Sequence, residues 1–182
     1  KIIRQFDKTE VLNFSGYEYQ VNAVDLLLDA EYGACFFEQG LGKTKVAIDI
    51  VVNWLNKKTC DTIIIFTKKH LVKNWIDEFK LHSSITPSVL TQNTRDNYYL
   101  FNSSVKVLIG HYEVANKELE RIKLFGKARD INTILDESQK LKNPNSKITK
   151  TFYEIRTAFK QRIILTGTPA ANRPYDIWSQ IF

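Results

Sequence analysis

Apolar and polar residues follow one another in blocks along this chain, and two kinds of spacing occur inside the blocks. Short runs rich in β-branched and aromatic residues are typical of buried strands. Six such runs are present, at residues 33–38, 62–67, 88–91, 105–110, 132–136 and 162–166. Longer segments, with apolar residues three or four positions apart, lie between them and predict helices. These segments are residues 19–30, 43–56, 69–80, 113–125 and 146–159.

The predicted strands are continuously apolar, which indicates strands that are buried on both faces. Strands of this kind that alternate with helices build a parallel sheet covered by helices on both sides. The pattern therefore predicts an α/β fold of three layers with a mainly parallel central sheet. Ligands bind such sheets at the carboxyl ends of the strands, so the loops that follow the strands are the candidate site.

Composition narrows the classes of protein to consider. The chain has 182 residues, 43% of them hydrophobic, which suits one globular domain and excludes disorder over most of its length. A net charge of +6 is compatible with a polyanionic partner. Cys35 and Cys60 stand far apart, so a zinc site or disulfide framework has little support. The apolar runs are too short to span a membrane, and we expect a cytoplasmic protein. The first residue is Lys1 and the chain has no methionine, so we expect a longer reading frame around it.

A glycine-rich segment, Gly40-Leu41-Gly42-Lys43-Thr44, lies between a predicted strand and a predicted helix. That context is the one in which backbone N–H groups cradle phosphates, with the lysine reaching the β- and γ-phosphates and the threonine hydroxyl placed on Mg²⁺. Phe37 stands where the full phosphate-loop pattern has its first glycine. Taken alone, the segment also fits a glycine-rich turn with an exposed lysine.

Two adjacent acids, Asp136 and Glu137, end the predicted strand at residues 132–136. An unpaired carboxylate there would be costly to bury, so both need a cation. Asp136 is suited to hold Mg²⁺ opposite Thr44, and Glu137 to orient and deprotonate a water that attacks the γ-phosphate. Without the phosphate loop, the same pair would be read as solvated turn residues. Together with Lys43, these acids are the predicted catalytic residues.

Five blocks resemble the motifs of one family in the same order and with similar spacing. They are Glu38-Gln39-Gly40-Leu41-Gly42-Lys43-Thr44, Leu71-Val72-Lys73-Asn74-Trp75 with Glu78-Phe79, Val107-Leu108-Ile109 with Tyr112-Glu113, Asp136-Glu137 through Lys142-Asn143, and Leu165-Thr166-Gly167-Thr168-Pro169. They are similar to the first RecA-like lobe of superfamily-two helicase-type ATPases, most closely of the Swi/Snf type. The resemblance implies a RecA-like P-loop NTPase domain over residues 1–182.

The resemblance also implies roles for residues outside the two central motifs. Gln20 matches the glutamine that contacts adenine, so the implied cofactors are ATP and Mg²⁺. Four residues lie in loops that face nucleic acid in the family, or are otherwise a solvated rim: Lys68, Lys69, His111 and Tyr112. Four others match positions that couple the phosphate state to nucleic acid: Gln139, Thr166, Gly167 and Thr168. Trp75 and Trp178 are interpreted as core or lobe-interface aromatics.

Several positions depart from the family's usual residues. Gln39 replaces a methionine, and Gly16-Tyr17-Glu18 replaces Leu-Arg-Pro. Thr67-Lys68 stands where a proline usually opens the second motif, and Ser138-Gln139 replaces a small residue and histidine. These departures weaken the adenine-site match and leave the coupling through Gln139 open. None of them alters Lys43, Asp136 or Glu137.

The implied function is an ATP hydrolase that couples hydrolysis to translocation on double-stranded DNA. Its implied partners are nucleic acid and a second RecA-like lobe, which has no counterpart in this sequence. No membrane partner is implied, and if the protein is bacterial we expect it at the nucleoid. Because the second lobe supplies an arginine to the γ-phosphate, the isolated lobe is expected to hydrolyse ATP poorly. The alternatives are a strand-separating DNA or RNA helicase, a restriction-system motor, a nucleotide-responsive binding module, and a basic α/β scaffold.

Overall fold

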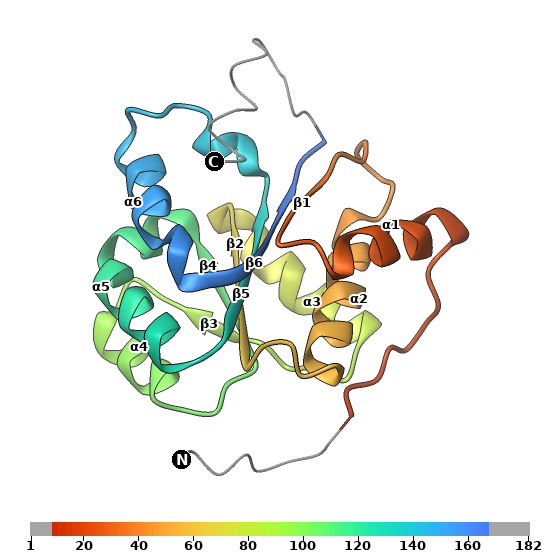
Figure 1. Ribbon diagram of the computed structural model, residues 1–182, viewed down its shortest axis with the longest axis horizontal. Coiled ribbons are helices and arrows are strands. Elements are labelled where there is room, and N and C mark those ends of the chain that lie inside the picture. Colours follow the sequence, from red (N-terminus) through yellow and green to blue (C-terminus); the bar gives the residue numbers. More distant parts are fainter. Residues whose placement is uncertain (1–8, 168–182) are drawn as a thin grey trace.

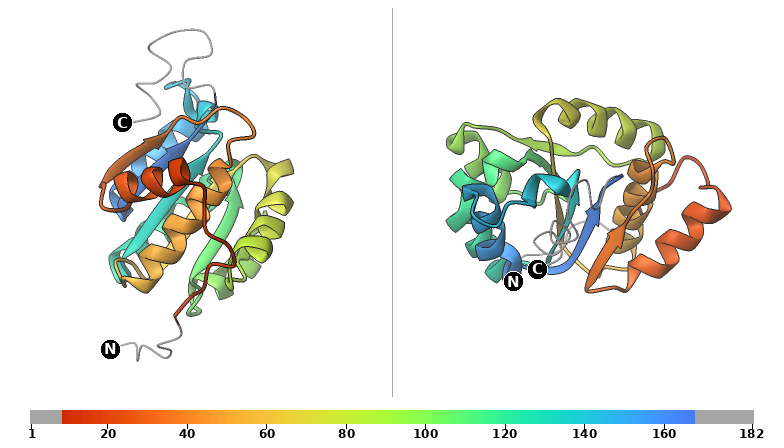
Figure 2. Two further views of the ribbon diagram at one scale, coloured as in Figure 1. Left: turned by 90° about the vertical axis from the view of Figure 1, so that its right-hand side faces the viewer. Right: turned by 90° about the horizontal axis from the view of Figure 1, so that it is seen from above.

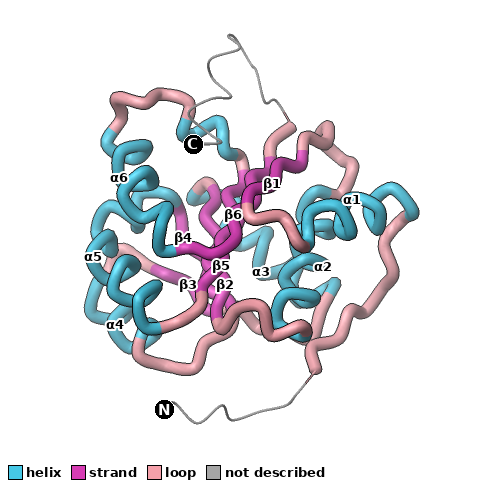
Figure 3. Tube along the Cα trace, in the orientation of Figure 1, coloured by secondary structure: helices cyan, strands magenta, loops and turns pink. Residues whose placement is uncertain are grey.

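A six-stranded sheet runs through the centre of the computed structural model, which describes residues 9–167 (Figures 1 and 3). The strands are β1 (Tyr32–Cys35), β2 (Thr62–Thr67), β3 (Ser88–Leu90), β4 (Val107–His111), β5 (Ile131–Asp136) and β6 (Phe159–Leu165). They lie in the order β1-β6-β5-β2-β4-β3, and every neighbouring pair is parallel. The predicted fold class is confirmed.

Helices cover both faces of this sheet, which gives the three layers seen in Figure 2. One face carries α1 (Glu18–Leu28), α2 (Lys43–Asn56) and α3 (Val72–His82), and the other carries α4 (Thr94–Phe101), α5 (Tyr112–Ala128) and α6 (Lys147–Ile155). Three 3₁₀ turns complete the elements: η1 (Lys69–Leu71), η2 (Ser138–Leu141) and η3 (Arg156–Ala158). Within residues 9–167, no helix has the length and apolar character needed to cross a membrane.

The sheet separates two apolar cores because successive side chains of a strand point to opposite faces. On β5, Ile134 packs into the core beneath α1, α2 and α3, whereas Leu135 packs into the core beneath α5 and α6. All six residues of β2 and all six of β5 are buried. The two central strands are therefore held on both sides, and the residues that follow them start from fixed positions.

Two differences between the structure and the predicted elements concern whole helices, and the strand predicted at residues 33–38 already ends at Cys35. Helix α4 was not predicted, because it is short and only Asn97 and Phe101 are buried along it. Its start is set by Asn93, whose side-chain oxygen accepts from the backbone of Arg95 at 3.1 Å. The helix predicted at residues 146–159 was too long: α6 ends at Ile155, and Phe159 already belongs to β6, where it pairs with Ile131.

Gly126 on α5 offers a test of how tightly the helices pack. A Cβ at this position would lie 2.6 Å from the carbonyl oxygen of Ala158 and 2.7 Å from its Cβ. Although alanine favours helix over glycine, we expect Gly126→Ala to lower the free energy of unfolding by about 1–3 kcal/mol, because backbone atoms must move. Urea unfolding measures the difference.

The exposed neighbour Lys127 supplies the control, since Lys127→Ala should change the free energy of unfolding by less than about 0.5 kcal/mol. A Gly126→Ala variant that is as stable as the parent would show that α5 does not approach η3 as closely as described.

Candidate functional site

The predicted site residues gather at one edge of the sheet. Their loops follow the carboxyl ends of β1, β6, β5, β2 and β4, which are consecutive in the sheet order. All of these strands are parallel, so their carboxyl ends face the same way (Figure 1). Thr168 and Trp178 lie outside the described residues. The topology thus brings together segments that are more than a hundred residues apart in sequence.

The segment at residues 40–44 forms a tight loop between β1 and α2. Gly40 and Gly42 have φ angles of +85° and +72°, a region that glycine occupies without strain. Helix α2 begins at Lys43, and the Lys43 ammonium donates to the carbonyl oxygens of Phe37 at 2.8 Å and Glu38 at 3.0 Å. The ammonium therefore lies across the loop, at the N-terminus of a helix whose dipole favours an anion.

Gln20 connects α1 to this loop. Its Oε1 accepts from the backbone N–H of Tyr17 at 2.9 Å, and its Nε2 donates to the carbonyl oxygen of Leu41 at 3.3 Å. A Cβ at Gly42 would lie 2.3 Å from Gln20 Nε2. One end of the Gln20 amide thus caps the start of α1 and the other holds the loop, and its predicted contact with adenine stays a prediction.

Asp136, the last residue of β5, is 7% exposed and is held by donors from two other elements. Thr67 Oγ1 and Trp75 Nε1 each lie 2.8 Å from Asp136 Oδ2. Burial raises the pKa of the Asp136 carboxyl, and these two hydrogen bonds oppose that rise. The sequence indicated Trp75 only as a core or interface aromatic; its contact with Asp136 could not be foreseen from spacing.

Glu137 follows in the left-handed region, with φ of 55°, which turns its side chain away from the strand direction. Lys68 Nζ lies 2.9 Å from Glu137 Oε2, and Gln139 Nε2 donates to the same oxygen. Partial burial would raise the pKa of Glu137, but the hydrogen bonds from Lys68 and Gln139 and the charges of Lys68 and Lys43 hold it below its ordinary value. Glu137 is therefore a stabilised carboxylate.

Gln139 links the acid pair to the end of β6. The Thr166 hydroxyl donates to Gln139 Oε1 at 2.9 Å, so Glu137, Gln139 and Thr166 form a chain of hydrogen bonds from β5 to β6. The next residue, Gly167, lies beside the phosphate loop, because a Cβ there would be 3.4 Å from Lys43 Nζ. This arrangement would let the predicted coupling residues respond to an occupant of the loop.

Residues at or after the ends of four strands, β2, β3, β4 and β5, line a basic hollow of about 530 Å³. They are Lys68, Lys69, His70, Gln92, His111, Tyr112, Glu113 and Lys140. Lys69 is exposed and Lys68 partly so, as a phosphate contact would require.

The other two predicted nucleic-acid residues have different surroundings. His111 is 9% exposed, with Nδ1 2.8 Å from Glu113 Oε2 and Nε2 3.0 Å from Gln92 Nε2. Tyr112 is 1% exposed, and its hydroxyl donates to the Asp136 carbonyl oxygen at 2.7 Å. The Tyr112 side chain is therefore buried against the backbone of Asp136. Only the Tyr112 backbone is left to contact a phosphate.

Comparison with known proteins now identifies the family. The profile of the SNF2-related domain matches residues 19–182. The chain belongs to the SNF2-related domain family. Its relatives include an uncharacterized ATP-dependent helicase of Mycoplasma genitalium, 28% identical over 178 residues, and the DNA repair and recombination protein RAD54B of Gallus gallus, 30% identical over 154 residues. The alignments cover 95% and 79% of this chain but 17% and 16% of the relatives, so the chain spans less than a fifth of their length.

A solved structure has the same fold as this SNF2-related domain. It is the Sulfolobus solfataricus SWI2/SNF2 ATPase core in complex with dsDNA, with a TM-score of 0.79 and 22% sequence identity. The match covers 96% of this chain and 36% of that chain. The family resemblance of the motifs is thus confirmed, and the three-layer architecture is shared.

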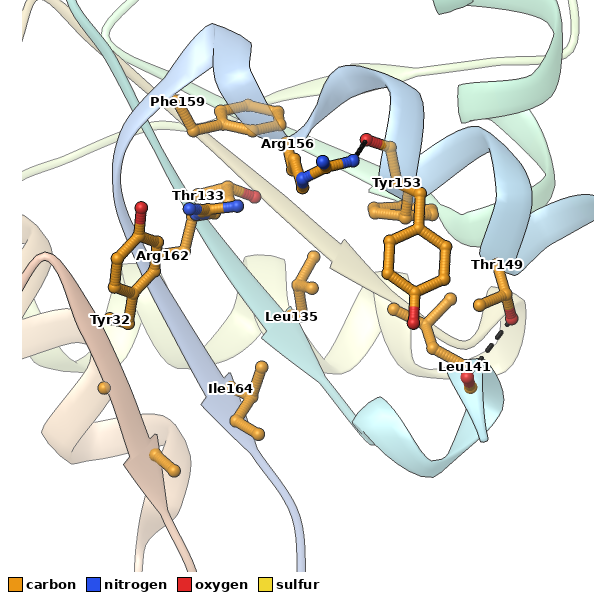
Figure 4. Close-up of a pocket in the computed structure, with 13 residues that line it drawn as sticks. Tyr32, Thr133, Leu135, Leu141, Thr149, Tyr153, Arg156, Phe159, Arg162 and Ile164 are labelled. Carbon is orange, nitrogen blue, oxygen red and sulfur yellow. Dashed lines mark hydrogen bonds between the residues drawn. The ribbon is translucent and has the colours of Figure 1, made fainter. Parts of the chain in front are cut away.

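Figure 4 shows a second cavity of the domain. It has a volume of about 120 Å³ and is lined by residues of β1, β5, β6 and α6, among them Leu135, Phe152 and Ile164. The Arg162 guanidinium lies over the Tyr32 ring, 4.1 Å from its centroid. The lining includes none of the predicted site residues.

The donor at Trp75 can be tested against a matched tryptophan. Trp75→Phe removes one of the two donors to the buried Asp136 carboxylate, so we expect Mg²⁺-dependent ATP binding to weaken about tenfold, the effect of a hydrogen bond to a charged group. Isothermal titration calorimetry measures the dissociation constant.

Trp54 is equally buried, but its Nε1 donates to the Leu28 carbonyl oxygen at 3.0 Å, away from the site. Trp54→Phe and Trp75→Phe should each lower the free energy of unfolding by about 1–2 kcal/mol, but Trp54→Phe should leave the affinity for ATP unchanged. Equal loss of affinity in both variants would mean that Trp75 acts only through general stability.

Proposed function

We propose that this SNF2-related domain is the ATP-binding lobe, over residues 1–182, of a motor that couples ATP hydrolysis to translocation on double-stranded DNA. One observation carries the proposal: the Lys43 loop and the Asp136–Glu137 pair lie at the same sheet edge and are connected through Gly167, Thr166 and Gln139. In this arrangement the loop could bind the phosphates, while the two acids lie near the Mg²⁺ and the water that attacks the γ-phosphate. The rest of the motor, a second RecA-like lobe, would come from the remainder of the protein.

The residues at this edge fit ATP and Mg²⁺. Gly40, Leu41 and Gly42 lead into α2, whose first backbone N–H groups have no partner within the helix. The Lys43 ammonium would exchange two carbonyl oxygens for phosphate oxygens. The Thr44 hydroxyl and the Asp136 carboxylate are hard oxygen ligands of the kind that Mg²⁺ prefers. Burial disfavours the charge on Asp136, and a cation beside it would offset that cost. When bound, Mg²⁺ supplies positive charge that neutralises the developing charge on the phosphates.

Glu137 is the group we assign to the water. Its carboxylate is ionised and partly buried at the strand end, which suits it to accept a hydrogen bond from the attacking water and take its proton. Gln139 holds Glu137 and Thr166 at once, so a change at either is passed to the other. Gln20 would orient the base of the nucleotide from the start of α1.

Nucleic acid is the proposed partner of the basic hollow. Lys68 and Lys69 lie at its rim, and the chain carries a net charge of +6. Lysines of this kind contact phosphates without reading base sequence. The structural relative is described in complex with dsDNA, which supports duplex DNA as the track.

Glu137 separates the proposed hydrolase from a nucleotide-responsive binding module, which would not need a base. In the protein that carries both lobes, Glu137→Gln should reduce kcat by about 10²-fold or more while ATP binding is kept, because the shape is retained and the base is lost. Lys43→Ala should instead weaken ATP binding by about tenfold or more. Steady-state ATPase assays and nucleotide titration measure the two effects.

Glu120→Gln, at an exposed position of α5, is the control and should leave both quantities unchanged. Turnover that survives Glu137→Gln would remove Glu137 as the base and with it the proposed hydrolysis mechanism.

The strand that is released distinguishes translocation on duplex DNA from unwinding of the duplex. We expect duplex DNA to stimulate ATP turnover and the protein to displace the third strand of a DNA triplex, while a fork with the same duplex stays paired. Release of a labelled strand from each substrate is the measurement. Unwinding of the fork would favour the strand-separating helicase instead.

A further inference from the structure

Lys68 lies between the two parts of the proposed site. It follows β2 directly and lines the basic hollow with one part of its side chain. Its ammonium, however, contacts Glu137 Oε2 at 2.9 Å. The side chain is 34% exposed and that of Glu137 is 20% exposed. One cation therefore faces the nucleic-acid side and the hydrolytic side of the domain.

The contact at Glu137 restrains the group assigned to the water. Lys68 and Gln139 both donate to the same carboxylate oxygen. Oε2 therefore has little capacity left for the proton of a water, and the two contacts also set the direction in which the other oxygen, Oε1, points. The ion pair and the Gln139 amide also fix the side chain of Glu137, whose own backbone lies in the left-handed region.

A phosphate in the hollow would compete for the same ammonium. Lys68 is a flexible side chain with a compact charge, and a partly exposed ion pair contributes little free energy, so a strong phosphate acceptor can displace it. Lys69 and Lys140 line the same hollow and would help to hold the phosphate there. A phosphate that draws the ammonium toward itself weakens the contact with Glu137 Oε2.

We propose that Lys68 is a positioning residue that restrains Glu137 until a nucleic-acid phosphate in the basic hollow draws its ammonium away. DNA binding then releases Glu137 to the attacking water, and part of the stimulation of hydrolysis by DNA passes through this ion pair. The inference rests on the proposed function, since it needs Glu137 as the base and DNA as the occupant of the hollow.

The test removes the charge of Lys68 and keeps its apolar stem, in the protein that carries both lobes. Lys68→Met should raise DNA-independent kcat about two- to fivefold, the range that a partly exposed ion pair can contribute. At saturating duplex DNA, kcat should stay near the parent value, so the stimulation ratio falls by the same factor. The KM for ATP should not change, because Lys43 and Gln20 are untouched. Lys68→Arg keeps the charge and should restore a low DNA-independent kcat.

Lys123 supplies the matched control. Its side chain is 31% exposed and its ammonium pairs with Glu154 at 2.9 Å, on α5 and α6 away from the site. Lys123→Met should leave the DNA-independent kcat and the stimulation ratio unchanged.

Two results would overturn the inference: a DNA-independent kcat of Lys68→Met equal to the parent, or a fall in kcat with and without DNA. The second would mean that Lys68 supports Glu137 instead of restraining it. Failure of the proposed function looks different, because the parent protein itself would then show no stimulation by duplex DNA, or Glu137→Gln would still turn over ATP.

Discussion

The site depends on how the domain compensates two adjacent carboxylates at the end of a fully buried strand. Asp136 and Glu137 leave β5 between two apolar cores, where an unpaired negative charge would cost several kcal/mol. The chain solves this in two ways. Asp136 receives neutral donors from Thr67 and Trp75, whereas Glu137 receives the charge of Lys68 and the amide of Gln139. The two acids thereby acquire different environments.

These contacts also set the geometry of the whole sheet edge. The partners of the acid pair come from β2, α3, α5 and η2, and Gln139 of η2 also accepts from Thr166 at the end of β6. Thr166 and Gly167 bring the edge into reach of the phosphate loop, and Gln20 connects that loop to α1. Substitution of any of these side chains therefore removes a contact between different elements of the sheet edge.

The fold and the central motifs could be predicted because both depend on residues that are close together in the sequence. Neighbouring residues are enough to recognise apolar strands, helical spacing, the Gly40–Thr44 segment and the acid pair. The contacts that join them could not be predicted, since Trp75 and Asp136, or Lys68 and Glu137, meet only when β2 pairs with β5. Tyr112 shows the same limit: its position after β4 was foreseen, but not that its side chain turns inward to the Asp136 carbonyl. Helix α4 was not predicted because only two of its residues, Asn97 and Phe101, are buried, and one of them is polar.

The central claim is that Lys43, Asp136 and Glu137 together enclose a triphosphate with its Mg²⁺. A crystal structure of the lobe with Mg²⁺ and a non-hydrolysable ATP analogue tests this most directly. The account predicts that the Lys43 ammonium leaves the carbonyl oxygens of Phe37 and Glu38 for phosphate oxygens, with the ion between Thr44 and Asp136. Nucleotide bound elsewhere, or phosphates that contact Lys43 while both acids point away from them, would contradict it.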